Sequence, residues 1–209
     1  MIRRLVLTLA GFAIAAGLAA CDDTRASSEH NFRMVVSRQL AEHGQLCIGR
    51  HQWPADLRDD TGPGVRDRIQ LPALEQAGLA RSSPTRITVK NRDGSMGEVD
   101  GRRYVLTELG ERYYVERPLI ATRNPDARRP DVCYAQLSLD RVVRWDPPHL
   151  ENGAPTTAVW FTYRIDAADW TQKPEIRKAF PMIAKIVDGA GKLKVHQRVQ
   201  LQADGWHAI

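Results

Sequence analysis

Residues 133–145 read CYAQLSLDRVVRW, and this alternation of apolar and mostly polar side chains is the clearest fold signal in the chain. Side chains two positions apart lie on one face of a β-strand, so the segment predicts a strand with one buried face, formed by its odd-numbered positions. The same alternation recurs from Thr156 to Ile165 and from Lys192 to Gln202. The C-terminal half is therefore expected to be a small antiparallel β-sheet.

One helix is predicted between the second and third of these strands. It begins at Lys173-Pro174-Glu175, because proline is favoured in the first turn of a helix, and extends to about Val187. Pro181 falls inside this span and should kink or divide the helix. Residues 131–209 are thus expected to form one β-rich α+β unit.

The residues before this unit predict a second arrangement, of helices followed by a hairpin. The predicted elements are a helix at 31–42, a brief strand at 46–49, a short helix at 54–57, a helix at 65–77 and two hairpin strands at 86–90 and 102–107. Gly44 and Gly78 end the two helices. An arginine-rich polar stretch with three prolines, residues 117–130, is the predicted linker between the two units.

This order of elements is the order of a winged helix, and two short motifs accompany it. The motifs LEQAGL at 74–79 and LTELG at 106–110 resemble the end of the recognition helix and the start of the following helix in MarR-like winged-helix regulators. The resemblance implies a winged-helix-like unit over residues 30–116. The matching residues mainly close or cap helices, so they imply a fold and not DNA binding.

Residues 1–20 predict a lipoprotein signal peptide. Arg3 and Arg4 precede the apolar run Leu5–Ala20, which is shorter than the roughly 18 to 20 residues needed to span a bilayer. The sequence Leu18-Ala19-Ala20-Cys21 resembles the lipobox of bacterial lipoprotein precursors, whose cysteine is lipidated and becomes the mature N-terminus. Cys21 is therefore the predicted lipidation site, and residues 21–29 the predicted tether. The alternatives are an ordinary secretory signal and an uncleaved anchor.

Two aspartates follow the predicted lipidation site. Asp22 and Asp23 resemble the pattern that retains lipoproteins in the inner membrane of enterobacteria. The expected location is the bacterial cell envelope, facing the periplasm, with the inner membrane favoured over the outer membrane. The membrane itself would be one partner, through the lipid on Cys21.

The remaining cysteines, Cys47 and Cys133, are an even pair in an oxidising compartment, which favours a disulfide. The alternative is two buried thiols that pack as small hydrophobic side chains. Aromatic residues gather in the C-terminal half, and among them Trp160 and Trp170 are the candidates for an exposed contact surface.

No catalytic, cofactor or metal-binding motif is evident in the sequence. The chain carries a modest excess of positive charge, +5, in which basic and acidic residues are interspersed, so a nucleic-acid partner is not expected. The function that fits best is non-catalytic: binding or supporting another envelope protein. The alternatives are a lipoprotein that binds a small molecule or a toxin, and a thiol-based or cell-wall-directed enzyme.

Overall fold

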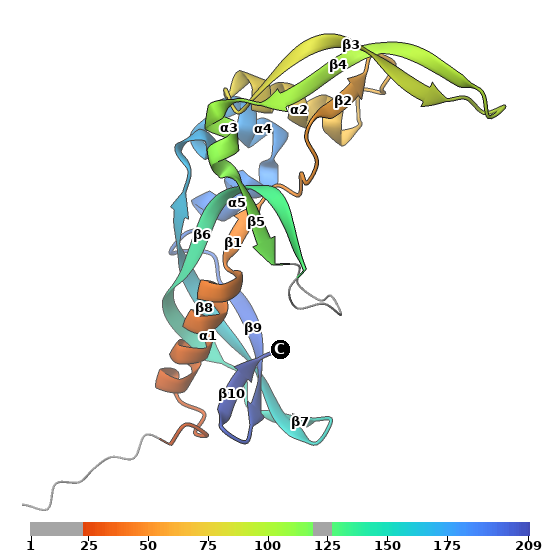
Figure 1. Cartoon of the computed structure of the whole chain (residues 1–209). Helices are drawn as coiled ribbons and strands as arrows, with labels where there is room; N and C mark the ends of the chain where they lie inside the picture. The colour runs from red at the N-terminus through yellow and green to blue at the C-terminus, as the bar shows by residue number, and fades with distance from the viewer. Residues whose placement is uncertain (1–22, 119–126) are drawn as a thin grey trace, which may run out of the picture.

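The computed structural model describes residues 23–118 and 127–209, which form an elongated, curved α+β molecule (Figure 1). Antiparallel strands run along its length, and helices pack against them. The larger sheet consists of β1 (Gln45–Cys47), β5 (Tyr114–Pro118), β6 (Arg128–Trp145), β7 (His149–Glu151), β8 (Ala154–Ala167), β9 (Val195–Gln202) and β10 (Gly205–Ala208).

Strand β6 is the backbone of this sheet, in which the strand order is β1-β6-β8-β9-β10. The strands predicted at 133–145 and 156–165 are parts of β6 and β8, and the strand predicted at 192–202 is β9, which begins only at Val195. The prediction of a single buried face is wrong at the start of the segment, where both Cys133 and Tyr134 are buried. The alternation also fails in the second half of β6, because β-bulges between Leu139 and Arg141 and between Val142 and Arg144 shift the register. A bulge adds a residue and exchanges the two faces. Val143 is consequently exposed, whereas Val142 packs toward the core.

Helix α1 (Glu29–His43) covers one end of the sheet. Ser28 caps it, because its hydroxyl oxygen accepts a hydrogen bond from the backbone N–H of Asn31. The helix, β9, β10 and the facing parts of β6 and β8 enclose one hydrophobic core, which we call the base. Its buried residues are Phe32, Val35, Val36, Leu40, Leu139, Val159, Phe161, Tyr163, Val199 and Trp206.

A second hydrophobic core lies farther along the molecule, among short helices. These helices are α2 (Arg66–Gln76), the 3-10 turn η1 (Asp169–Gln172), α4 (Pro174–Ala179) and α5 (Pro181–Asp188). The single helix predicted near 173–187 is thus two helices, because Pro181 divides it and starts the second one.

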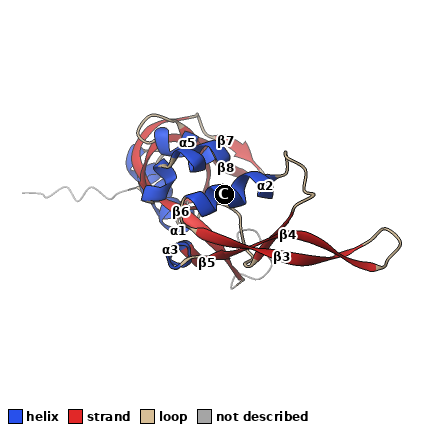
Figure 2. Cartoon of the chain, turned by 90° about the horizontal axis from the view of Figure 1, so that it is seen from above, coloured by secondary structure: helices blue, strands red, loops and turns tan. Residues whose placement is uncertain are grey.

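A separate sheet, with the order β2-β4-β3, forms the end opposite the base. It consists of β2 (Ala55–Arg58), β3 (Ala80–Lys90) and β4 (Met96–Leu106), and we call it the hairpin end. The short helix predicted at 54–57 is wrong, because these residues form β2 and pair with β4. Strands β3 and β4 form the predicted hairpin, with longer strands than expected and Gly94 at its tip in a left-handed conformation. Strand β2 covers only residues 101–104 of β4, so the outer hairpin is a two-stranded ribbon that projects from the body (Figure 2).

The two predicted units are interleaved in the structure. Helix α1, expected in the first unit, packs on the base with strands of the second unit. Residues 117–118 and 128–130 of the predicted linker belong to β5 and β6, which pair with each other, and residues 119–126 lie outside the described residues. Helix α3 (Glu108–Tyr113) leads into β5. The structure therefore does not confirm a winged-helix unit over residues 30–116.

Candidate functional site

The predicted tether is docked on the base from Asp23 onward. The guanidinium of Arg25 donates to the carbonyl oxygen of Gln202 at 2.9 Å, and the indole N–H of Trp206 donates to the carbonyl oxygen of Arg25 at 3.2 Å. The side-chain amide of Asn31 donates to the carbonyl oxygen of Asp23 at 2.8 Å. This segment is therefore part of the folded base.

The predicted lipidation site and one of the two predicted sorting residues, Cys21 and Asp22, lie outside the described residues. Asp23, the other sorting residue, is exposed at the base. Within residues 23–118 and 127–209, no helix combines the length and the apolar character needed to cross a membrane.

A candidate functional site surrounds Cys47 of β1 and Cys133 of β6. These cysteines form a disulfide that joins β1 to β6 across 86 positions, so the predicted pairing is confirmed and the alternative of two thiols is wrong. Because each sulfur is bonded to the other, neither is available as a thiolate nucleophile.

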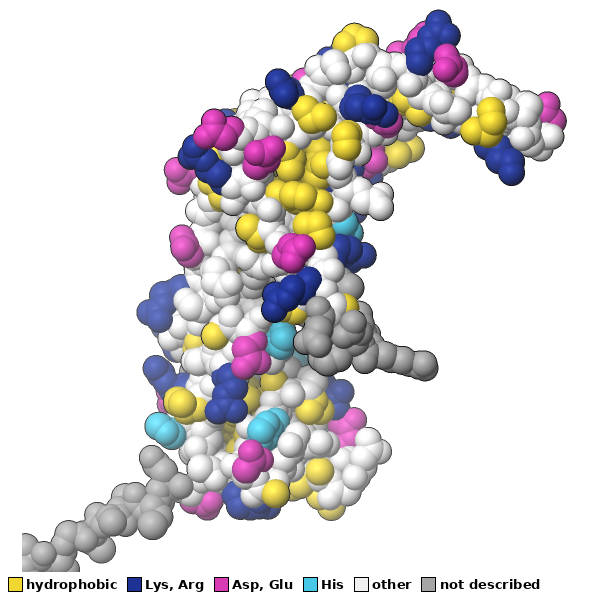
Figure 3. Space-filling view, in the orientation of Figure 1, with side chains coloured by type: hydrophobic (Ala, Val, Ile, Leu, Met, Phe, Trp, Pro, Cys, Tyr) yellow, Lys and Arg dark blue, Asp and Glu magenta, His cyan; other side chains and the backbone are white. Residues whose placement is uncertain are grey.

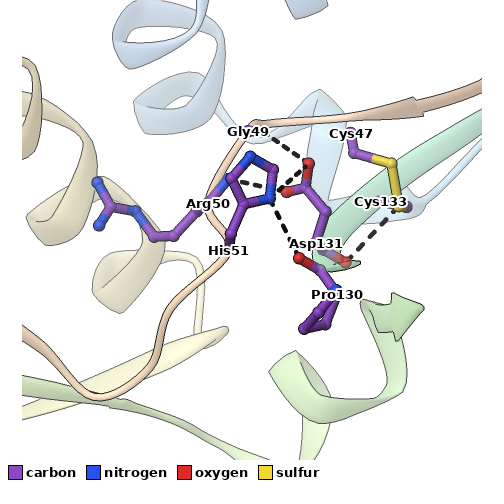
Figure 4. The surroundings of a disulfide bond; sticks show 7 residues. All are labelled: Cys47, Gly49, Arg50, His51, Pro130, Asp131 and Cys133. Atoms are coloured by element: carbon purple, nitrogen blue, oxygen red, sulfur yellow. Dashed lines mark hydrogen bonds and ion pairs between the residues drawn. A yellow bond between two sulfur atoms is a disulfide. The ribbon is translucent and has the colours of Figure 1, made fainter. Parts of the chain in front are cut away.

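Asp131, two positions before Cys133, organises the loop that follows β1 (Figure 4). Its side chain is 2% exposed. It accepts hydrogen bonds from the backbone N–H groups of Gly49 at 3.1 Å and of Arg50 at 2.8 Å. A buried carboxylate needs such donors, and here they are main-chain groups on a distant segment. Sequence reasoning missed Asp131, because nothing in the local sequence indicates which backbone groups it meets.

His51 completes this arrangement. Its Nδ1 lies 3.1 Å from the carbonyl oxygen of Pro130 and 3.5 Å from a carboxylate oxygen of Asp131 (Figure 4). Its own carbonyl oxygen accepts a hydrogen bond from the hydroxyl of Tyr114 at 2.6 Å. Burial, and then the negative charge of Asp131, raise the pKa of Tyr114 above its ordinary value. The loop is thus held from β5 and β6 together.

Two arginines tie the same loop to α2. Arg50 makes an ion pair with Asp67, and its Nε atom is buried without a hydrogen-bond partner. Arg66 donates to the carbonyl oxygen of Ile48 and, at 2.7 Å, to the side-chain oxygen of Gln70. Sequence reasoning noticed no cluster here, because these residues are dispersed along the chain.

Two adjoining clefts, with volumes of about 490 and 320 Å³, open beside the disulfide. Both are lined by Gly49, His51 and Arg129, and we call them together the junction cleft. Arg50, Arg66 and Asp67 line the larger part, whereas Arg117, Asp131 and Cys47 line the smaller part. The cleft is polar and open, and thus differs from a deep apolar pocket for a drug-sized ligand.

Trp160, one of the two predicted contact residues, lies partly buried on β8 among polar side chains. Its indole N–H donates to a carboxylate oxygen of Asp146 at 3.3 Å, and the Arg144 guanidinium lies 4.6 Å from its ring centroid. The hydrogen bonds from Trp160 and then from Arg144 lower the pKa of Asp146 below its ordinary value. Trp160 is therefore already engaged within the protein.

The prediction that Trp170 is exposed is wrong. Its side chain belongs to η1 and is 3% exposed in the second core, where it packs edge-on against Tyr113 and Tyr134. The short 3-10 turn folds it inward, so it serves packing, and the two tryptophans do not form one surface. Among the described residues, no group of three or more His, Cys, Asp and Glu side chains is placed to hold a metal ion.

Comparisons with protein-family profiles, with characterised proteins and with solved structures found no match to this chain.

Proposed function

We propose that this protein is a lipid-anchored, periplasm-facing envelope protein that acts by binding another envelope protein and not by catalysis. The observation that carries this proposal is the docked segment from Asp23 onward, which lies at the end of the molecule opposite the β3–β4 hairpin (Figure 1). With the lipid on Cys21, two residue steps separate the anchor from the docked segment, a reach of about 7 Å. The base would then lie against the membrane.

In this geometry the lipid anchor would fix the position of the protein relative to the membrane. The base would carry the hairpin end away from the bilayer, and α1 within the base is about 22 Å long, from 15 residues at 1.5 Å each. Lipid chains confine the protein to the membrane surface and raise its effective concentration beside a membrane partner. The hairpin end is then the surface that a partner meets first.

The hairpin end has properties suited to such contact. Strand β3 is an edge strand, and the outer ribbon carries exposed side chains such as Met96, which is 66% exposed. On the face shown in Figure 3, Lys and Arg side chains are interspersed with Asp and Glu, which favours a protein partner over a nucleic acid.

We also infer that α2 with the β2-β4-β3 sheet is a reduced winged-helix arrangement. A helix followed by a hairpin, whose second strand pairs with a short strand before the helix, supports this relation. Helix α1 is not part of this arrangement, because it packs on the base. The inference concerns the fold only.

Membrane fractionation with fatty-acid labelling tests the anchor. The wild-type protein should carry the label and sediment with membranes, whereas Cys21→Ser should lose the label and become soluble without loss of fold. Retention of Cys21→Ser on membranes after a high-salt wash, with normal cleavage, would overturn the proposal. As a matched control, Asp22→Ser/Asp23→Ser should keep the label and, with an enterobacterial sorting rule, move to the outer membrane.

A further inference from the structure

The junction cleft carries more positive charge than its acidic residues balance. Its charged lining residues are Arg50, Arg66, Arg117, Arg129, Asp67 and Asp131. Asp67 pairs with Arg50, and Asp131 accepts from the loop backbone and lies beside His51. Four guanidinium groups against two carboxylates leave two positive charges uncompensated among these residues.

Two of the four arginines lie opposite each other on neighbouring strands and have no partner among the residues that the structure describes. Arg117 of β5 lies directly opposite Arg129 of β6 in the antiparallel register. Neither side chain makes a hydrogen bond or an ion pair with any residue in the described ranges. Like charges directly opposite each other on neighbouring strands are destabilising. An anion bound between them would remove this repulsion.

We propose that the junction cleft binds a phosphate group, with Arg117 and Arg129 as its main ligands. A guanidinium presents paired N–H donors that match the oxygens of phosphate or carboxylate. A phosphate dianion neutralises both uncompensated charges, whereas a single carboxylate neutralises one. Arg66, which donates to neutral oxygens only, lines the adjoining part of the cleft with Arg129.

The cleft is larger than a free phosphate ion requires. With volumes of about 490 and 320 Å³ in its two parts, it has room for a group attached to the phosphate. The ligand chemistry is therefore a phosphate monoester, on a soluble molecule or on a lipid headgroup, with inorganic phosphate as the smallest probe. This binding role goes beyond the proposed anchoring and does not depend on it.

Calorimetric titration of the full-length protein in non-ionic detergent with sodium phosphate, at pH 7.5 and fixed ionic strength, tests the site. The wild type should bind saturably, and Arg117→Gln/Arg129→Gln should bind at least about tenfold more weakly. The charge-matched control Arg81→Gln/Arg92→Gln, at exposed hairpin positions, should bind within about twofold of the wild type. Without phosphate, the free energy of unfolding of Arg117→Gln/Arg129→Gln should be at least that of the wild type, because the repulsion between the two arginines is removed. If the double variant does not fold, Arg129→Gln alone tests phosphate binding in the same way.

Three results would overturn the proposal: no saturable binding of phosphate by the wild type, equal weakening in the hairpin control, or equally tight binding of acetate. Sedimentation of Cys21→Ser with vesicles of phosphatidate in phosphatidylcholine then identifies the source. If Cys21→Ser binds the vesicles and the triple variant Cys21→Ser/Arg117→Gln/Arg129→Gln does not, the phosphate belongs to a lipid. Phosphate binding without vesicle binding assigns it to a soluble ligand. Since Cys21→Ser keeps the cleft, failure of the anchor and failure of the cleft are distinguishable.

Discussion

The base and the hairpin end are built from the same kind of antiparallel strands, yet they differ in how they are held. In the base, Phe32 is fully buried, with its ring centroid 5.2 Å from those of both Trp145 and Trp206. In the outer hairpin, two strands pair with each other alone, and such a ribbon has little stability of its own. Stability is thus concentrated at one end and accessible surface at the other, as expected where binding elements come from the less stable part of a protein.

The disulfide between these two ends gives the largest expected effect. Cys47→Ala/Cys133→Ala removes a cross-link across 86 positions, which in the chain-entropy model costs about 4 to 5 kcal/mol of the free energy of unfolding. Urea unfolding of the variant and the wild type measures this loss. A loss below about 1 kcal/mol would mean that packing alone holds the junction.

The second largest effect is expected from removing the aromatic ring of Phe32, which lies at the centre of the base. Phe32→Ala leaves a cavity between two tryptophans and should cost about 3 to 5 kcal/mol in urea unfolding. The matched hairpin variant Val99→Ala, at a half-buried position of the outer ribbon, should cost less than about 1 kcal/mol. Similar losses at the two positions would contradict the contrast between the ends.

Thr107 connects the hairpin end to α3, and its loss should have an intermediate effect. Its hydroxyl accepts a hydrogen bond from the N–H of Gly110 at 3.1 Å and donates to the carbonyl oxygen of Gly78 at 2.6 Å. Thr107→Ala should cost about 1 to 2 kcal/mol, whereas Thr107→Ser keeps the hydroxyl and most of the stability. Hydrogen exchange should show the added opening at the hairpin end, with protection of α1 unchanged.

The smallest effect is expected from the ion pair between β2 and β4. Hydrogen bonds from Arg103 at 2.7 Å, and then its charge, lower the pKa of Asp56 in the folded state. The pair therefore adds stability above the unfolded pKa of about 3.9, and that stability is lost as the pH falls through the lower folded pKa. Asp56→Asn should shift the urea midpoint at pH 7 less than Thr107→Ala does, and should flatten its fall below about pH 4. An unchanged acid dependence would show that the pair contributes nothing.

The sequence predicts the elements better than it predicts their packing. Alternation indicates the strands at 133–145, 156–165 and 192–202, and Asp93-Gly94 indicates the hairpin, because these signals are local. The bulges near Leu139 and Val142 have no glycine or proline to mark them. Likewise, the apolar face of α1 is evident from its spacing, but the spacing does not say which sheet it covers.

The sequence likewise predicts only part of the candidate site. With Cys21 set aside as the predicted lipidation site, the two remaining cysteines and the expected oxidising compartment favour the disulfide without any knowledge of the fold. Asp131 and His51 meet their hydrogen-bond partners only through the fold, because those partners lie on distant segments. Arg117 and Arg129 are brought opposite each other by the register of β5 and β6, which the sequence does not indicate. Trp170 shows the opposite error, since exposure cannot be inferred for an aromatic residue in a turn that folds back on the core.

We propose that the base lies at the membrane and holds the hairpin end away from it. Energy transfer to lipids labelled on their headgroups tests this directly, with a fluorophore placed at Ala203 in the β9–β10 turn or at Asp93 at the hairpin tip of the anchored protein. We predict strong transfer from position 203 and weak transfer from position 93. Equal transfer, or stronger transfer from the hairpin tip, would contradict the account.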